Sequence, residues 1–89
     1  MIQEKYNGYT NYPTWCAALW FKNNYEEYKK IKELTKIAKD MYELTDLIES
    51  HIIAGMPDIT PSFYQDILSW GLSKIDVYEI AKILKEDQT

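Results

Sequence analysis

Hydrophobic residues recur at helical spacing along most of the chain, and this pattern predicts an all-α fold. Between residues 25 and 53 an apolar position follows every third or fourth residue, which places these side chains on one face of a helix. The seam contains Ile31, Leu34, Ala38, Met41, Thr45, Ile48 and Ile52. One helix across this stretch would extend about 45 Å, longer than a globule of 89 residues is wide. We therefore expect two helices here, with one long helix as the alternative.

Three pairs of residues have the spacing of a capping box, an Asn or Asp followed three residues later by Glu. They are Asn24 with Glu27, Asp40 with Glu43, and Asp76 with Glu79. Such pairs satisfy the free backbone N–H groups at the start of a helix. They predict a helix that begins near residue 25, a break near residue 40, and a last helix over about residues 77–85.

Proline and glycine predict the remaining boundaries. Pro13 suits the first turn of a helix, and the apolar run WCAALWF after it predicts a central helix that is buried on most faces. Gly55 followed by Pro57 predicts a stop, with Gly55 in the left-handed conformation. Thr60 is expected to cap a further helix, with Pro61 in its first position and its end near residue 71.

The sequence therefore predicts a single helical domain over residues 1–89, a compact bundle of four to five short helices. Residues 1–12 differ in composition, because tyrosines alternate with Asn, Gly and Thr. We expect an extended, Tyr-rich segment that packs on or near the core. The expected core contains Trp15, Leu19, Trp20, Leu34, Ile48, Ile67, Trp70, Ile80 and Leu84.

Charge and composition exclude several classes of function. The chain has 10 lysines, no arginine and 14 acidic residues, for a formal net charge of −4. Proteins that bind nucleic acids or anionic membranes need a basic surface, so neither partner is expected. No apolar run approaches the roughly 20 residues that span a membrane, and we expect no secretory signal. The lone Cys16 fits a reducing cytoplasm.

No set of residues points to catalysis. Cys16 and His51 are the only thiol and imidazole, and a nucleophilic pair would need them about 3 Å apart with an orienting third group. A zinc site needs three or four such ligands. Asp40, Glu43, Asp46 and Glu49 are spaced by three residues, so on a helix they spread around the surface and do not gather into a magnesium site. We therefore expect no enzyme activity, no catalytic residue, no metal and no cofactor.

The acidic residues nevertheless suggest a binding surface. No lysine or arginine lies between Lys39 and Lys74, whereas this window holds several acids. The candidate partner-binding residues are Asp40, Glu43, Asp46, Glu49 and Asp58, with Tyr6 and Tyr9 as an aromatic anchor. Such a surface would suit a host protein with a basic surface. In the alternative interpretation, acidic and basic segments fold against each other and the tyrosines close the core.

Several stretches resemble a family of small proteins of unknown function that phages and plasmids encode. NGYTNYPTWCAALWFKNN is similar to the N-Y-x-T-W and A-L-W that open the family, and MYELTDLIESHI to its Y-E-L-A-D-type helix. YQDILSWGLSKIDVYEIAKIL resembles the ending V-D/N-W-x-E-I-A. The resemblance rests on Asn11, Tyr12, Thr14, Trp15, Leu19, Trp20, Asp76, Glu79, Ile80 and Ala81. Pro13 and Tyr78 depart from it, where the family usually has Glu and often Trp.

The resemblance implies no activity, but it implies a setting, a mobile genetic element in the cytoplasm of a bacterial host cell. Two hypotheses follow. In the first, the protein binds and modulates a host protein, as an inhibitor of a host defence nuclease of the anti-CRISPR or antirestriction type would. In the second, it is a structural or assembly protein that acts through helix-mediated self-association. The protein would then form a homo-oligomer.

Overall fold

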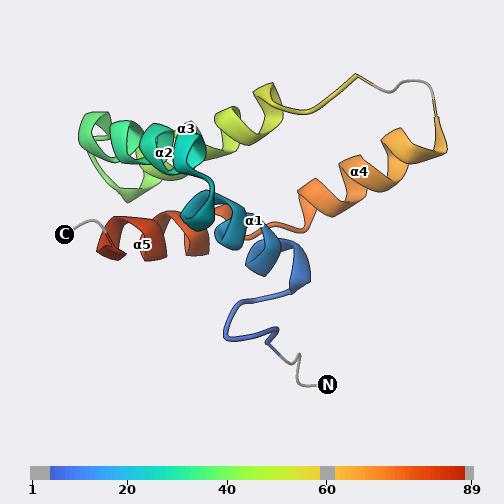
Figure 1. Cartoon of the computed structure of the whole chain (residues 1–89), viewed down its shortest axis with the longest axis horizontal. Helices are drawn as coiled ribbons and strands as arrows, with labels where there is room; N and C mark the ends of the chain where they lie inside the picture. The colour runs from blue at the N-terminus through green and yellow to red at the C-terminus, as the bar shows by residue number, and fades with distance from the viewer. Residues whose placement is uncertain (1–4, 59–61, 88–89) are drawn as a thin grey trace.

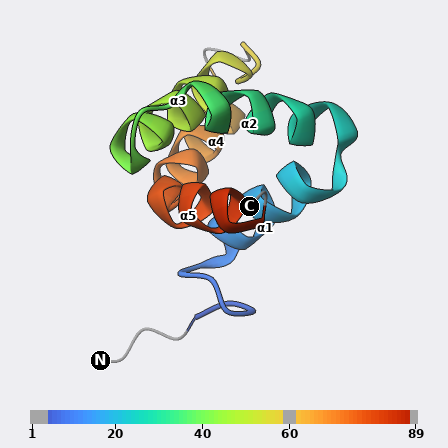
Figure 2. The same ribbon diagram turned by 90° about the vertical axis from the view of Figure 1, so that its left-hand side faces the viewer.

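The computed structural model describes residues 5–58 and 62–87, which form five helices (Figure 1). These are α1 (Tyr12–Asn23), α2 (Tyr25–Ile37), α3 (Met41–Ala54), α4 (Phe63–Ser73) and α5 (Val77–Asp87). The expected all-α single domain is confirmed. Helices α1, α2, α3 and α5 form a closed ring in which each packs against the next, with α2 and α3 above α1 and α5 in Figure 2. Helix α4 extends away from this ring (Figure 1).

The core lies inside the ring. Its buried apolar residues are Ala18, Phe21, Ile31, Leu34, Leu44, Ile48, Ile80, Ala81 and Leu84. All four ring helices contribute to it, whereas α4 contributes no buried residue. The Cα radius of gyration is 13.6 Å, against about 12 Å expected for a compact domain of this length. A helix that projects from the ring accounts for the difference.

The predicted core is correct in α2, α3 and α5 and wrong in α1 and α4. Leu34, Ile48, Ile80 and Leu84 are buried, and Trp15 is half-buried. By contrast, Leu19, Trp20, Ile67 and Trp70 are exposed. In α1 the inward positions are Thr14, Ala18 and Phe21, spaced by four and three residues, so Leu19 and Trp20 lie on other faces. Helix α1 is therefore buried on one face only.

The predicted break near residue 40 is confirmed, so the alternative of one long helix is wrong. Asn24 caps α2, where its Oδ1 accepts a hydrogen bond from Glu27 N at 3.1 Å. Asp40 caps α3, and its Oδ1 accepts from Glu43 N at 2.8 Å. The Glu43 carboxylate in turn accepts from Lys39 N at 3.1 Å, so the reciprocal bond comes from the residue before the cap and not from Asp40 N, as it would in a standard capping box. Because the chain turns here, α3 packs against α2, and the predicted apolar seam is shared between these two helices.

Other helix boundaries differ from the expectation. Gly55 follows α3 as predicted, but its φ of −86° lies in the right-handed region, so the expected left-handed cap is wrong. Its N–H donates to carbonyls of the last turn of α3. Helix α4 begins at Phe63, where Ser62 Oγ accepts a hydrogen bond from Gln65 N at 3.0 Å. Ser62 therefore caps this helix in place of Thr60, and Thr60 and Pro61 lie outside the described residues.

A two-residue hairpin precedes α1. Tyr6 and Tyr9 exchange backbone hydrogen bonds of 2.7 and 2.8 Å. Asn7 and Gly8 between them both have positive φ, 48° and 90°. This is the Asn-Gly signature of a tight hairpin turn. The Tyr-rich segment is thus a hairpin, and Tyr9 packs against the core.

A buried threonine ties the start of α1 to the start of α5. Thr14 is fully buried, and its hydroxyl donates to Asn11 Oδ1 at 2.6 Å and accepts from Asp76 N at 2.8 Å. Asn11 caps α1 by accepting from Thr14 N at 3.0 Å, and its amide donates to the Lys74 carbonyl at 2.7 Å. These residues, which the chain separates widely, form one hydrogen-bonded unit that we call the N-terminal latch.

Thr10 adds two further bonds to the latch. Its N–H donates to Glu79 Oε1 at 2.9 Å, and its hydroxyl donates to Asp76 Oδ2 at 3.3 Å. Asp76 also accepts from Glu79 N at 3.1 Å, so the predicted cap of α5 forms. The Glu79 carboxylate, however, binds the N-terminal segment in place of the cap backbone. Asn11, Thr14, Asp76 and Glu79 are therefore explained by folding, because each holds the latch together.

Candidate protein-binding surface

The predicted acidic residues lie around α3, where they divide into two groups. Asp40 and Glu43 cap the helix, so their carboxylates already accept backbone hydrogen bonds. Asp46 and Glu49 are exposed and make no hydrogen bond or ion pair within the part of the chain that the structure describes. Asp58 follows α3 and is exposed, but unlike Asp46 and Glu49 it already interacts with another part of the protein. Asp46 and Glu49 are thus the pair best placed to meet a partner.

Two exposed apolar side chains share the outer side of α3 with these acids. Tyr42, Asp46, Glu49 and Ile53 follow one another at steps of four, three and four residues, which places them on one helix face. Tyr42 is 77% exposed and Ile53 is 59% exposed. We call these four residues the acidic face. It combines negative charge with apolar surface, the mixture found in protein interfaces.

The tyrosines proposed as an anchor do not join the acidic face. Tyr6 packs edge-on against Tyr12 with ring centroids 5.2 Å apart, and it lies 5.1 Å from the Trp15 ring. Tyr9 is half-buried against the core. Figures 1 and 2 both show the N-terminal hairpin on the opposite side of the ring from α3. The structure therefore separates the two halves of the predicted binding surface.

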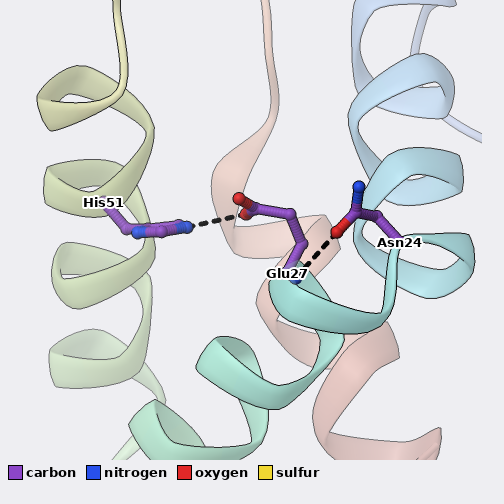
Figure 3. Close-up of polar contacts among 3 residues, drawn as sticks. All are labelled: Asn24, Glu27 and His51. Atoms are coloured by element: carbon purple, nitrogen blue, oxygen red, sulfur yellow. Dashed lines mark hydrogen bonds and ion pairs between the residues drawn. The ribbon is translucent and has the colours of Figure 1, made fainter.

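His51 and Cys16 occupy different surroundings. His51 Nε2 lies 2.7 Å from Glu27 Oε2, which links α3 to α2 (Figure 3). The backbone N–H of the same Glu27 is held by the Asn24 cap (Figure 3). Cys16 is half-buried and borders a hollow between α1 and α4, whereas His51 borders another hollow. His51 is thus partly buried and has a structural partner in Glu27.

Sequence reasoning missed a surface on α4. Phe63, Tyr64, Ile67 and Trp70 are 72%, 71%, 55% and 60% exposed. Their positions, together with Gly71, fall on one side of the helix. We call these five residues the α4 stripe. The spacing of Phe63, Ile67 and Trp70 by four and three residues was visible in the sequence, but apolar residues at such spacing usually face a core.

Helix α4 borders a hollow on each of its two sides. On the side of the stripe, a hollow of about 470 Å³ lies between α4 and the α1 residues Tyr12, Pro13, Cys16 and Ala17. On the other side, a hollow of about 330 Å³ lies between α4 and the end of α3, where Glu49 and Ile53 border it. Leu72 and Ile75 line both. One side of α4 is therefore apolar, and the other adjoins the acidic face.

Across residues 5–58 and 62–87, no group of three or more His, Cys, Asp or Glu side chains is arranged to hold a metal ion. In the same residues, no helix has both the length and the apolar composition needed to cross a membrane.

Comparison with known proteins gives one match. The family model described as "Family of unknown function (DUF7249)" matches residues 2–89. No curated protein and no solved structure matches the chain.

Proposed function

The chain belongs to DUF7249, a family of unknown function, and we propose that it is a non-catalytic protein that binds another protein. The observation that carries this proposal is the acidic face of α3. Asp46 and Glu49 are exposed there between Tyr42 and Ile53 and beside a hollow that α4 completes. An exposed face of mixed charge and apolar surface offers contact area, but it has no group poised for chemistry.

The charge of this side defines the kind of partner. Helices α3 and α4 together contain acidic residues and one histidine, but no lysine or arginine. A partner with a basic surface would be attracted to it, and the attraction raises the association rate more than the affinity. The 14 acidic residues are offset by 10 lysines, so the charge suits a local patch better than the whole channel of a nucleic-acid-binding protein.

The resemblance to phage- and plasmid-encoded proteins gives this partner a setting. A small protein of a mobile element that binds a basic surface would act in the cytoplasm of its bacterial host. Proteins that bind nucleic acids have such basic surfaces. The proposed role is therefore modulation of a host protein. In its specific form, the protein inhibits a host defence nuclease, as anti-CRISPR or antirestriction proteins do.

Reversing two charges on the acidic face tests this role. The double variant Asp46→Lys, Glu49→Lys is expected to lose the host protein that the tagged wild-type chain captures from a host lysate. Asp40 and Glu43 are left intact because they cap α3. With the captured protein purified, the association rate of the variant should fall about tenfold or more at low salt and lose most of its salt dependence.

The matched control is Glu26→Lys with Glu33→Lys, which makes the same change in net charge at exposed positions of α2. This control should bind like the wild type. Capture of the same protein by the acidic-face variant at the wild-type rate would contradict the proposal, as would recovery of the tagged chain alone.

A second test concerns the absence of catalysis. Cys16→Ser and His51→Ala are expected to leave the biological effect unchanged, because neither residue belongs to the acidic face. His51→Ala removes a partly exposed hydrogen bond with Glu27, so unfolding should become easier by about 1 kcal/mol or less. Denaturant unfolding checks this value. Loss of the effect in a folded variant that still binds its partner normally would point back to an enzyme.

A further inference from the structure

Among residues 5–58 and 62–87, no helix packs over the largely exposed α4 stripe, and we propose that the stripe binds the α4 stripe of a second copy. In this arrangement the two helices lie antiparallel across a two-fold axis that passes beside Ile67. The inference goes beyond the proposed function, because it uses the side of α4 that faces away from the acidic face. Helix α4 lacks cover, the stripe offers apolar area without charge, and the order of its residues is self-complementary.

Helix α4 lacks the packing that normally stabilises a short helix. It has 11 residues, and none of them is buried. Isolated helices shorter than about 12–15 residues are marginal in water, and most take their stability from an apolar face packed on other elements. Among the described residues, Leu72 near the end of α4 is half-buried, and Ile75, which follows the helix, packs against the core. A second helix laid along the stripe would supply the rest.

The exposed area is sufficient for a weak but specific dimer. From the exposed fractions of Phe63, Tyr64, Ile67 and Trp70 and the size of such side chains, the stripe offers about 600 Å² per copy. Two copies would bury about 1,200 Å², the lower limit of specific interfaces. The hollow beside α1 adds apolar surface at the edge.

The charge of the stripe also suits a second copy. Two chains of net charge −4 repel each other over most of their surfaces, but the stripe itself contains no charged side chain. Lys74, which lies 5.5 Å from the centroid of the Trp70 ring, marks one end of the helix. Antiparallel pairing keeps the two copies of Lys74 at opposite ends, so like charges do not meet.

The order of residues in the stripe is self-complementary about Ile67. Tyr64 and Trp70 lie three residues before and after it, and Phe63 and Gly71 lie four residues before and after it. A two-fold axis at Ile67 therefore places Phe63 of each copy over Gly71 of the other, and Tyr64 beside Trp70. A bulky side chain opposite a glycine allows the helices to approach closely, and a two-fold interface contains this contact twice.

Gly71 has no other explanation in the structure. It lies inside α4, where glycine destabilises a helix relative to alanine. Its φ is not positive, and a Cβ atom at this position would meet nothing within 4 Å. The residues that the structure describes thus give no reason for a glycine here. A second copy does, because the Phe63 ring would occupy the space that a side chain would fill.

The first experiment measures mass against concentration by analytical ultracentrifugation, from about 1 μM to 1 mM. The wild type is expected to shift from 10.6 kDa towards twice this mass. Ile67→Glu places two like charges at the axis and should weaken the dimer at least tenfold. Ser69→Glu adds the same charge on the other side of α4, beside the α3 hollow, and should dimerise like the wild type. Circular dichroism establishes that each variant is folded.

A mixing experiment tests the antiparallel register itself. Gly71→Leu alone should weaken self-association at least tenfold, because the added side chain meets Phe63 of the other copy on both sides. Phe63→Ala alone should also weaken it, because both aromatic contacts are lost. A mixture of the two variants should associate about as tightly as the wild type, since the leucine then faces the alanine and the remaining Phe63 faces the remaining Gly71.

Each outcome decides the proposal without reference to the host partner. A wild-type mass of 10.6 kDa at every concentration would overturn it, and so would a dimer that Ile67→Glu leaves intact. A dimer disrupted by Ile67→Glu but not restored by mixing Gly71→Leu with Phe63→Ala would overturn the antiparallel register. None of these changes touches Asp46 or Glu49, so the proposed host-binding role is tested separately.

Discussion

Replacing Ile80 by alanine is expected to lower the free energy of unfolding by about 2–5 kcal/mol. Ile80 has no exposed surface, and α5 packs against both α1 and α3. The lost side chain would leave a cavity at the centre of the ring, which the surrounding helices can fill only in part. Small domains have a total stability of about 5–15 kcal/mol, so the loss is a large share of it. Urea unfolding followed by circular dichroism measures the change.

Trp20→Ala is the contrasting substitution, and it should lower the free energy of unfolding by about 1 kcal/mol or less. The sequence alone places Trp20 in the core, where its loss would destabilise the protein severely. In the structure it is 62% exposed, so most of its surface is in contact with water before and after the change. A loss for Trp20→Ala as large as that for Ile80→Ala would contradict the fold, since Trp20 would then have to be buried.

The starts of α2, α3 and α5 could be predicted because they depend on local chemistry. Asn24, Asp40 and Asp76 each satisfy backbone N–H groups within three residues of themselves. Such caps act over one turn, so the sequence contains the whole interaction. The fold class follows from the same signals together with the apolar seam of residues 31–52.

Which face of a helix lies inward could not be predicted where apolar residues surround it. In α1, Ala18 is buried while its neighbour Leu19 is exposed, although both are apolar. The choice depends on where α2 and α5 lie, and no local pattern encodes that. The same ambiguity hid the α4 stripe, because Ile67 and Trp70 have the spacing of core residues. Only the direction in which α4 leaves the ring shows that they face outward.

The candidate site was predicted in part for a related reason. Charge runs are visible in sequence, so Asp46 and Glu49 could be identified as exposed acids. Whether Tyr6 and Tyr9 share their surface depends on the path of the chain between residues 12 and 40. The latch fixes that path through contacts between distant residues, Thr14 with Asp76 and Thr10 with Glu79. It holds the tyrosines on the side of the ring opposite α3, and no spacing in the sequence indicates this.

The latch itself leads to the last prediction. Thr14→Val keeps the shape of the side chain but removes the hydroxyl, and it should lower the free energy of unfolding by about 1–3 kcal/mol. The reason is that the backbone N–H of Asp76 loses the oxygen 2.8 Å away and Asn11 Oδ1 loses its donor at 2.6 Å. Thr14 is fully buried and the Asp76 amide is part-buried, so solvent replaces this hydrogen bond poorly, whereas Asn11 Oδ1 keeps its bond from Thr14 N. Denaturant unfolding measures the loss.

Thr14→Ser separates the hydroxyl from the methyl group. It keeps the oxygen and removes one buried methyl, so about 1 kcal/mol of stability should be lost through packing alone. Hydrogen exchange distinguishes the two variants at the latch. The Asp76 amide should exchange faster in Thr14→Val than in Thr14→Ser, even under conditions that give both the same global stability. Equal exchange rates would mean that the Thr14 hydroxyl does not hold the Asp76 amide, and the N-terminal segment would then have to be docked by packing of Tyr9 alone.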